Sequence, residues 1–171
     1  MHLTKASIAR VCGMALGFLA LGCGSSGSGG GSSDPAAAFP ATWTFTSGMI
    51  DPMCSGLGST LTPFDLTGDT MTVTRVDPTQ VSTMLTGTGV MCDVNFTVSG
   101  MIATAEAGQT CAFTVAVGGT STAVTVDITS WTLTVSGDSL TMSMSGSANI
   151  QQIISCTPMG MGTATRPSSG G

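Results

Sequence analysis

The stretch VMCDVNFTVSG, residues 90–100, alternates apolar and polar side chains with a period of two. The apolar side chains at every second position are Val90, Cys92, Val94, Phe96 and Val98. Successive side chains of a β-strand point to opposite faces of the sheet. The pattern therefore predicts a strand with one buried face and one solvated face.

The same alternation continues on both sides of this stretch. It recurs in residues 71–73, 111–117, 124–128, 131–135 and 140–144. The apolar positions change from even to odd numbers between Ile128 and Trp131, which predicts a β-bulge or a tight turn at Thr129–Ser130. Dipeptides that favour turns separate the runs: Ser47-Gly48, Gly68-Asp69, Ser99-Gly100, Gly118-Gly119 and Gly137-Asp138.

We therefore expect a single all-β domain over residues 39–166, built as an antiparallel up-and-down meander of about eight to ten strands. Closure of such a meander into a barrel removes the exposed sheet edges. A β-sandwich is the alternative arrangement of the same strands.

Two short segments at the ends of this domain carry a family resemblance. Trp43 follows the small residue Ala41 on the first predicted strand, and Thr163-Ala164-Thr165-Arg166 ends the last one. These segments resemble the lipocalin-type calycin barrels, which have Gly-x-Trp on the first strand and an arginine near the last. Ala41 stands where that family has glycine. The resemblance implies a lipocalin-like barrel in which Arg166 lies over the ring of Trp43.

The N-terminus has the organisation of a signal peptide. Basic residues come first and a mostly apolar run, residues 11–21, follows; this run is too short to span a bilayer. The run ends in Ala20-Leu21-Gly22-Cys23, which resembles the lipobox of bacterial lipoproteins. The resemblance implies cleavage after residue 22 and acylation of Cys23, and Gly24 implies an outer-membrane location, on its periplasmic face or at the cell surface. Ordinary secretion with Cys23 as a spare thiol is the alternative.

Residues 23–38 read as a tether, since GSSGSGGGSS at 24–33 has no side chain that drives burial, and residues 167–171 read as a loose tail. Beyond Cys23 the chain keeps two cations, Arg75 and Arg166, against nine acids, a formal charge of −7. Such a chain cannot neutralise phosphates, so we expect no nucleic-acid binding and contact with a membrane through the lipid anchor only.

Four further cysteines predict two disulfides, as an even number does in an exported chain. Three pairings exist, and we expect Cys92 with Cys111 and Cys54 with Cys156. A zinc site is excluded by spacing, because the chain has no C-x₂-C pair and no histidine beyond His2.

Catalytic chemistry is scarce in this composition. Beyond Cys23 there is no histidine or lysine to activate a nucleophile, so paired carboxylates such as Asp65 with Asp69 are the remaining acid–base option. A weak calcium site at the same two residues is conceivable, but the ligand pattern of an EF-hand is absent. We expect no enzyme and no cofactor, with most acids in turns or on solvated strand faces.

Methionine is enriched, and it forms two M-x-M pairs, Met142/Met144 and Met159/Met161. Thioethers suit Cu(I), so a copper-handling role is a remote alternative. Methionines also fill irregular cores or line adaptable cavities. We expect a lipid-anchored envelope protein without catalytic activity that binds a small apolar ligand or a protein partner. A structural or adhesive surface lipoprotein is the alternative, indicated by the Thr/Ser-rich strand faces.

Overall fold

The computed structural model describes residues 34–55, 61–87, 89–117, 120–150 and 154–167. The expected signal peptide (1–22), the lipidated Cys23, the tether up to residue 33 and most of the tail therefore lie outside the described residues. The Gly118-Gly119 turn also lies outside them.

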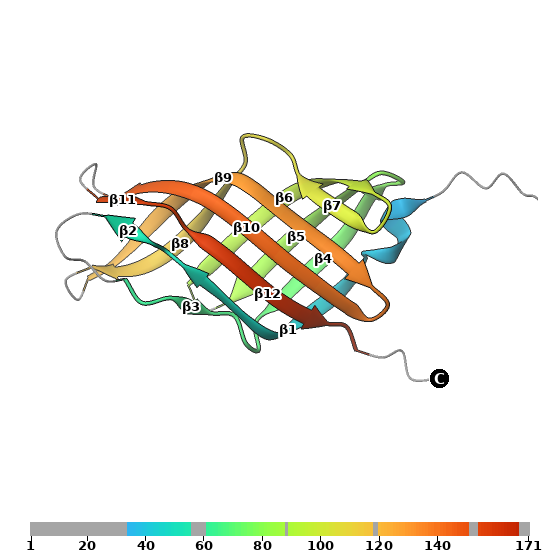
Figure 1. The fold of residues 1–171 in the computed structure, drawn as a ribbon, viewed down its shortest axis with the longest axis horizontal. Coiled ribbons are helices and arrows are strands. Elements are labelled where there is room, and N and C mark those ends of the chain that lie inside the picture. The colour runs from blue at the N-terminus through green and yellow to red at the C-terminus, as the bar shows by residue number, and fades with distance from the viewer. Residues whose placement is uncertain (1–33, 56–60, 88, 118–119, 151–153, 168–171) are drawn as a thin grey trace, which may run out of the picture. The chain divides into compact units, whose positions relative to one another are not determined.

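The described chain is an antiparallel β-barrel that closes on itself (Figure 1). Its elements are the 3₁₀ helix η1 (Pro35–Ala38) and strands β1 (Ala41–Asp51), β2 (Cys54–Ser55), β3 (Phe64–Asp65), β4 (Thr70–Asp77), β5 (Gln80–Gly87), β6 (Val90–Ser99), β7 (Ile102–Ala105), β8 (Thr110–Val117), β9 (Thr120–Ser136), β10 (Ser139–Ile150), β11 (Ile154–Cys156) and β12 (Met159–Thr165). The wall has eight positions, with β7 and β8 sharing one of them between β6 and β9. Around the wall the strands follow in the order β1, β4, β5, β6, β7 with β8, β9, β10 and β12, and β12 pairs back with β1. The short strands β2 and β3 lie outside this ring and pair with β11 and β1. The expected up-and-down barrel is confirmed, and closure excludes the sandwich.

The predicted irregularity at Thr129–Ser130 is a β-bulge inside β9. Ser145 of β10 pairs with Ser130 and Gly146 pairs with Ile128, so Thr129 is the extra residue. The hydroxyls of Thr129 and Ser130 both lie within hydrogen-bonding distance of the Ser145 hydroxyl, at 2.9 and 2.8 Å. The bulge keeps Ile128 and Trp131 on the inner face although their numbers differ in parity.

Gly48 departs from its predicted role as a turn residue. It lies within β1 opposite Gly162 of β12, beside a register shift between Phe45 and Ser47. A Cβ at Gly48 would lie 2.9 Å from the Cα of Gly162. The glycine therefore permits a close approach of two strands rather than a reversal of the chain.

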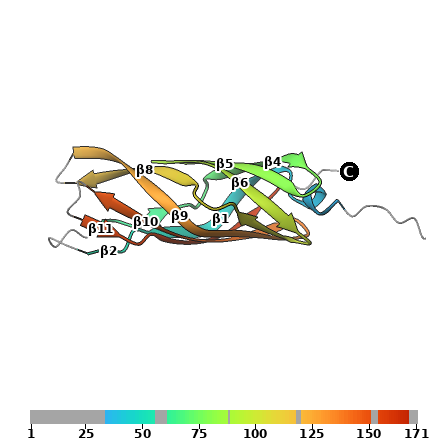
Figure 2. The same cartoon turned by 90° about the horizontal axis from the view of Figure 1, so that it is seen from above.

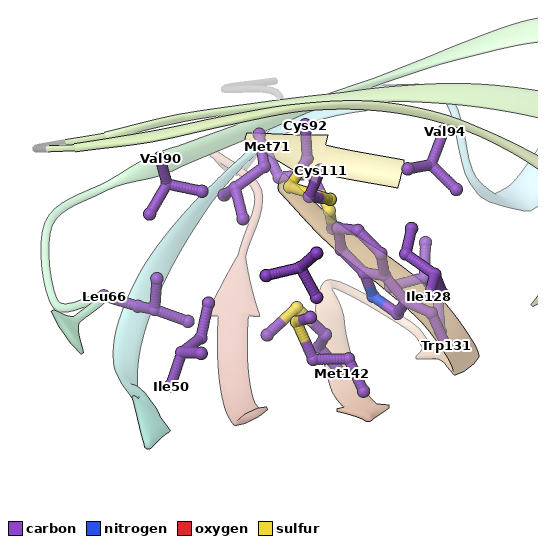
Figure 3. Packing of buried hydrophobic residues seen from close by; sticks show 14 of the residues in the cluster. Ile50, Leu66, Met71, Val90, Cys92, Val94, Cys111, Ile128, Trp131 and Met142 are labelled. Carbon is purple, nitrogen blue, oxygen red and sulfur yellow. A yellow bond between two sulfur atoms is a disulfide. The ribbon is translucent and has the colours of Figure 1, made fainter. Parts of the chain in front are cut away.

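Large side chains fill the inside of the barrel, as Figure 3 shows for part of the core. Trp43, Trp131, Phe45 and Phe96 are each at most 1 % exposed. The rings of Phe96 and Trp131 meet edge to face with centroids 5.6 Å apart, an arrangement that adds about 0.5–1.5 kcal/mol to the burial of their area. The two layers of strands lie close together in Figure 2, with β4, β5, β6 and β8 in one layer and β1 and β10 in the other.

Strand β12 contributes unusually small residues to this interior. Gly160 and Ala164 are buried on its inner side. A Cβ at Gly160 would lie 2.6 Å from Cγ of Met144 and 3.0 Å from Cγ1 of Ile50. Side chains from the neighbouring strands therefore occupy the space that a residue of β12 would otherwise take.

Replacing Gly160 with valine should destabilise the barrel by about 1–3 kcal/mol, because the added carbons overpack a filled core. Thr165→Val is the matched control, since it places the same side chain at an exposed position of the same strand. Urea unfolding of both variants measures the difference. Equal stability of the two variants would show that the interior has room to spare.

The end of the barrel at which the described chain begins is closed by η1. Ala36 is fully buried and its N–H donates to the carbonyl of Pro78 at 3.1 Å, while Asp34 forms an ion pair with Arg75 at 2.7 Å. Residues 34–38 thus pack with the domain, although the sequence places them in the tether.

Arg166 directly follows β12, whose C-terminal end lies at the same end of the barrel as η1 (Figure 1). Its guanidinium carbon is 5.4 Å from the ring centroid of Trp43, as the lipocalin resemblance implies. Its Nε also donates to Asp138 at 2.8 Å. Both described cations are therefore paired with acids at this one end of the barrel.

Candidate functional site

The interior of the described barrel offers little chemistry. Thr83 is the one buried hydroxyl among the described residues, and it donates to the carbonyl of Val94 at 3.3 Å. Two indole N–H groups are also buried: that of Trp43 donates to the carbonyl of Phe39 at 2.9 Å, and that of Trp131 has no acceptor within reach in the described part of the chain. An apolar cavity beside Ile50, Phe64 and Phe113 holds about 20 Å³. That is room for about one water molecule, whereas ligand pockets measure about 300–1,000 Å³.

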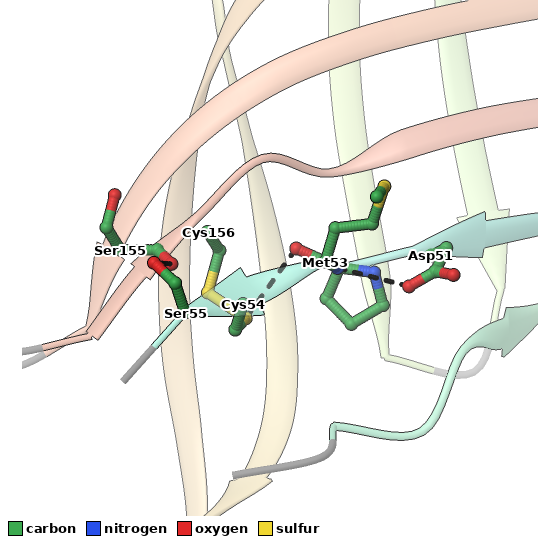
Figure 4. The surroundings of a disulfide bond; sticks show 7 residues. Asp51, Met53, Cys54, Ser55, Ser155 and Cys156 are labelled. Atoms are coloured by element: carbon green, nitrogen blue, oxygen red, sulfur yellow. Dashed lines mark hydrogen bonds between the residues drawn. A yellow bond between two sulfur atoms is a disulfide. The ribbon is translucent and has the colours of Figure 1, made fainter. Parts of the chain in front are cut away.

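The two disulfides pair as expected from the sequence. Cys54 is bonded to Cys156 across 102 residues, and Cys92 to Cys111 across 19. The first joins β2 to β11 (Figure 4), at the end of the barrel away from η1 (Figure 1). The second crosses the wall between β6 and β8. Stable disulfides are typical of oxidising compartments, so they indicate an extracytoplasmic protein.

Three of the acids serve local backbone structure. Asp51, Asp65 and Asp77 each accept the backbone N–H of the residue two positions on, at 3.1, 2.8 and 2.7 Å. Hydrogen bonds from the side chain and backbone of Thr67 lower the pKa of Asp65, and the N–H of Thr79 does the same for the pKa of Asp77. These are the turn roles that aspartate favours.

The described residues contain no group of three or more His, Cys, Asp or Glu side chains that could hold a metal ion. The conceivable calcium site at Asp65 and Asp69 therefore gains no third acidic ligand in the part of the chain that the structure describes. Oxygen ligands for Ca²⁺ normally number six to eight.

The methionines divide between the two faces of the barrel wall. Met71, Met142 and Met144 are buried in the core. Seven others are 46–73 % exposed: Met49, Met53, Met84, Met91, Met101, Met159 and Met161. The two M-x-M pairs of the sequence thus differ, because the first faces inward from β10 and the second faces outward from β12.

A groove on the outer wall follows the seam between β6 and β8. These strands pair at Val90 and Met91, and the ladder then breaks where the side chain of Gln109 binds the backbone N–H and C=O of Asn95 at 2.6 and 2.7 Å. The Cys92–Cys111 disulfide holds the wall together at this break. The groove measures about 460 Å³ and is lined by Met84, Leu85, Thr86, Met91, Cys92, Asp93, Thr110, Cys111, Ala112 and Thr125.

The charge around this groove is negative. Asp93 lines it, and Asp127 is exposed directly across from Thr110. The two described cations, Arg75 and Arg166, form their ion pairs at the η1 end. Met84 lies directly opposite Asp93, and Met91 lies two residues before Asp93 on the same strand, so both exposed thioethers are beside a carboxylate that no described cation pairs with. We call this surface the seam groove.

No protein-family model matches this chain, and no curated protein and no solved structure matches it. The residues themselves therefore carry the functional argument. Among the described residues, no helix has both the length and the apolar character needed to cross a membrane.

The seam groove itself was not predicted from the sequence, and only some of its lining residues were expected on the outer surface. The alternation placed Met91 and Asp93 on the outer face of their strand, which is where they lie. The meeting of Met84 with Met91 depends on the pairing of β5 with β6, in which Met84 lies opposite Asp93. A register of this kind follows from tertiary structure and has no local signal.

Proposed function

We propose that this chain is a lipid-anchored protein of the outer membrane, without catalytic activity, whose barrel binds a protein partner in the seam groove. The lipobox-like end at Cys23 supports the anchor, and the two disulfides agree with an exported protein. The scarcity of catalytic side chains, with three acids engaged in turns, supports a binding role over an enzymatic one.

The observation that carries the proposal is the exposure of Met84 and Met91 in a groove of about 460 Å³. Methionine is flexible and polarisable, and surfaces that adapt to protein partners use it often. A partner outside the barrel is favoured over a small apolar ligand inside it, because the inner cavity of about 20 Å³ is too small for such a ligand.

The charge pattern specifies the partner further. Asp93 lies beside both methionines and Asp127 lies on β9, across β8 from them. Complementary charge steers association and suppresses wrong partners. We therefore expect the bound segment to be extended, to present apolar side chains to the thioethers and to carry lysine or arginine.

A synthetic peptide of alternating leucine and lysine tests this binding mode. The purified protein should bind this peptide. Met91→Ser should weaken binding at least about fivefold, because the peptide would then bury a serine hydroxyl instead of making apolar contact with the methionine side chain. Asp93→Asn should reduce the salt dependence of binding. Fluorescence anisotropy measures both effects.

Met49→Ser is the control, since Met49 is also exposed, at 51 %, but lies on β1, away from the groove. An equal loss of peptide affinity in Met49→Ser and Met91→Ser would indicate nonspecific binding to exposed methionines and would overturn the proposal.

A further inference from the structure

A second group of exposed methionines lies on the wall formed by β1 and β12. Met49 of β1 pairs directly with Met161 of β12, and Met159 lies two residues before Met161 on the same outer face. Their side chains are 51, 73 and 52 % exposed, respectively. We call these three residues the thioether trio.

The pairing register places the trio at three corners of a small rectangle. Directly opposed residues have their Cβ atoms about 4.5–5.5 Å apart, and diagonal neighbours are about 7–8 Å apart. Met159 and Met161 lie two positions apart along β12, which corresponds to a rise of about 6.6 Å. Methionine has three rotatable side-chain bonds. All three sulfur atoms can therefore turn toward one point above the sheet.

The neighbours of the trio leave that point open and negatively charged. On β10, Ser143 lies opposite Met161 and Ser145 opposite Met159, so no large side chain competes for the space. The fourth corner of the rectangle is Asp51, which pairs with Met159, and Asp65 of β3 pairs with Met49. Two carboxylates thus border three soft, uncharged donors.

We propose that the thioether trio binds a single soft monovalent cation, Cu(I) or its analogue Ag(I). Thioethers select soft ions such as Cu(I), whereas carboxylate and water ligands suit Mg²⁺ and Ca²⁺. The nearby Asp51 and Asp65 raise the local concentration of cations. The site is separate from the seam groove, whose methionines lie on β5 and β6, and it does not depend on the proposed partner.

Titration of the purified protein with Ag(I) in chloride-free buffer tests the site. With methionine methyl groups labelled by ¹³C, the NMR signals of Met49, Met159 and Met161 should shift and saturate at one equivalent. The signals of Met84 and Met91 should stay in place. Zn²⁺ should shift none of them.

Met161→Leu should weaken Ag(I) binding at least about tenfold, because Met161 is the one member of the trio that neighbours both of the others, Met49 across the strands and Met159 along β12. Met49→Leu should also weaken it. Met84→Leu, which changes an exposed methionine of β5 outside the trio, should leave the Ag(I) affinity within about twofold. Equal losses in Met161→Leu and Met84→Leu, or shifts spread over all seven exposed methionines, would overturn the proposal. Leucine keeps each position apolar, so the fold is not at risk in these variants.

Discussion

Removal of the Cys54–Cys156 disulfide, in the double variant Cys54→Ala/Cys156→Ala, should cost about 4–5 kcal/mol of unfolding free energy. The bond closes a loop of 102 residues, and in the chain-entropy model a loop of about 100 residues contributes about 4.7 kcal/mol by restricting the unfolded chain. Since domains are stable by only about 5–15 kcal/mol, this loss is a large fraction of the total.

Little else attaches β2 to the barrel wall, because β11 is its only neighbour in the described sheet. Strands β2 and β11 pair at only two positions, Ser55 with Ser155 and Cys54 with Cys156. Guanidinium unfolding should show a lower midpoint together with a higher m-value, because the unfolded chain without the bond exposes more surface.

The adjacent pair on the same two strands provides the control. The Ser55 hydroxyl donates to the Ser155 carbonyl at 3.3 Å in an exposed position, and Ser55→Ala/Ser155→Ala should cost no more than about 1 kcal/mol. A similar small loss in the cysteine variant would mean that the unfolded chain is already compact without the bond.

The barrel was predictable because period-two alternation is a local signal that survives in the fold. Residues 90–98 alternate buried and exposed as the sequence indicates. The parity change before Trp131 predicted a β-bulge or a tight turn at Thr129–Ser130, and the structure has the bulge, with Thr129 as the extra residue that keeps Ile128 and Trp131 on one face. Closure followed from the need to avoid exposed sheet edges.

The facing of the last strand was not predictable from the residues alone. In MGMGTAT, residues 159–165, the hydrophobic rule places the methionines inside. The structure places glycines inside instead, because Phe45, Ile50 and Met144 already occupy the volume above them. Which M-x-M pair reaches solvent thus depends on packing between strands that are distant in sequence, and so do both candidate binding surfaces.

Cys23→Ser should convert the protein from a membrane-bound to a released form. This is the largest functional change that we expect from a single substitution, which here exchanges one sulfur atom for oxygen. The lipobox resemblance implies that the Cys23 thiol carries a diacylglyceryl group. Each buried CH₂ adds about 0.8 kcal/mol, so two or three chains anchor stably where one chain would be marginal.

Growth with radioactive palmitate and separation of membranes from soluble fractions measure the effect. The parent chain should carry label and sediment with the outer membrane, whereas Cys23→Ser should lose both properties. Gly24→Asp should keep the label and move the protein to the inner membrane, because the resemblance implies that an aspartate at this position changes sorting. A Cys23→Ser chain that still sediments with membranes would contradict the anchor. In that case the exposed methionines on the outer surface of the barrel would have to hold the protein at the envelope.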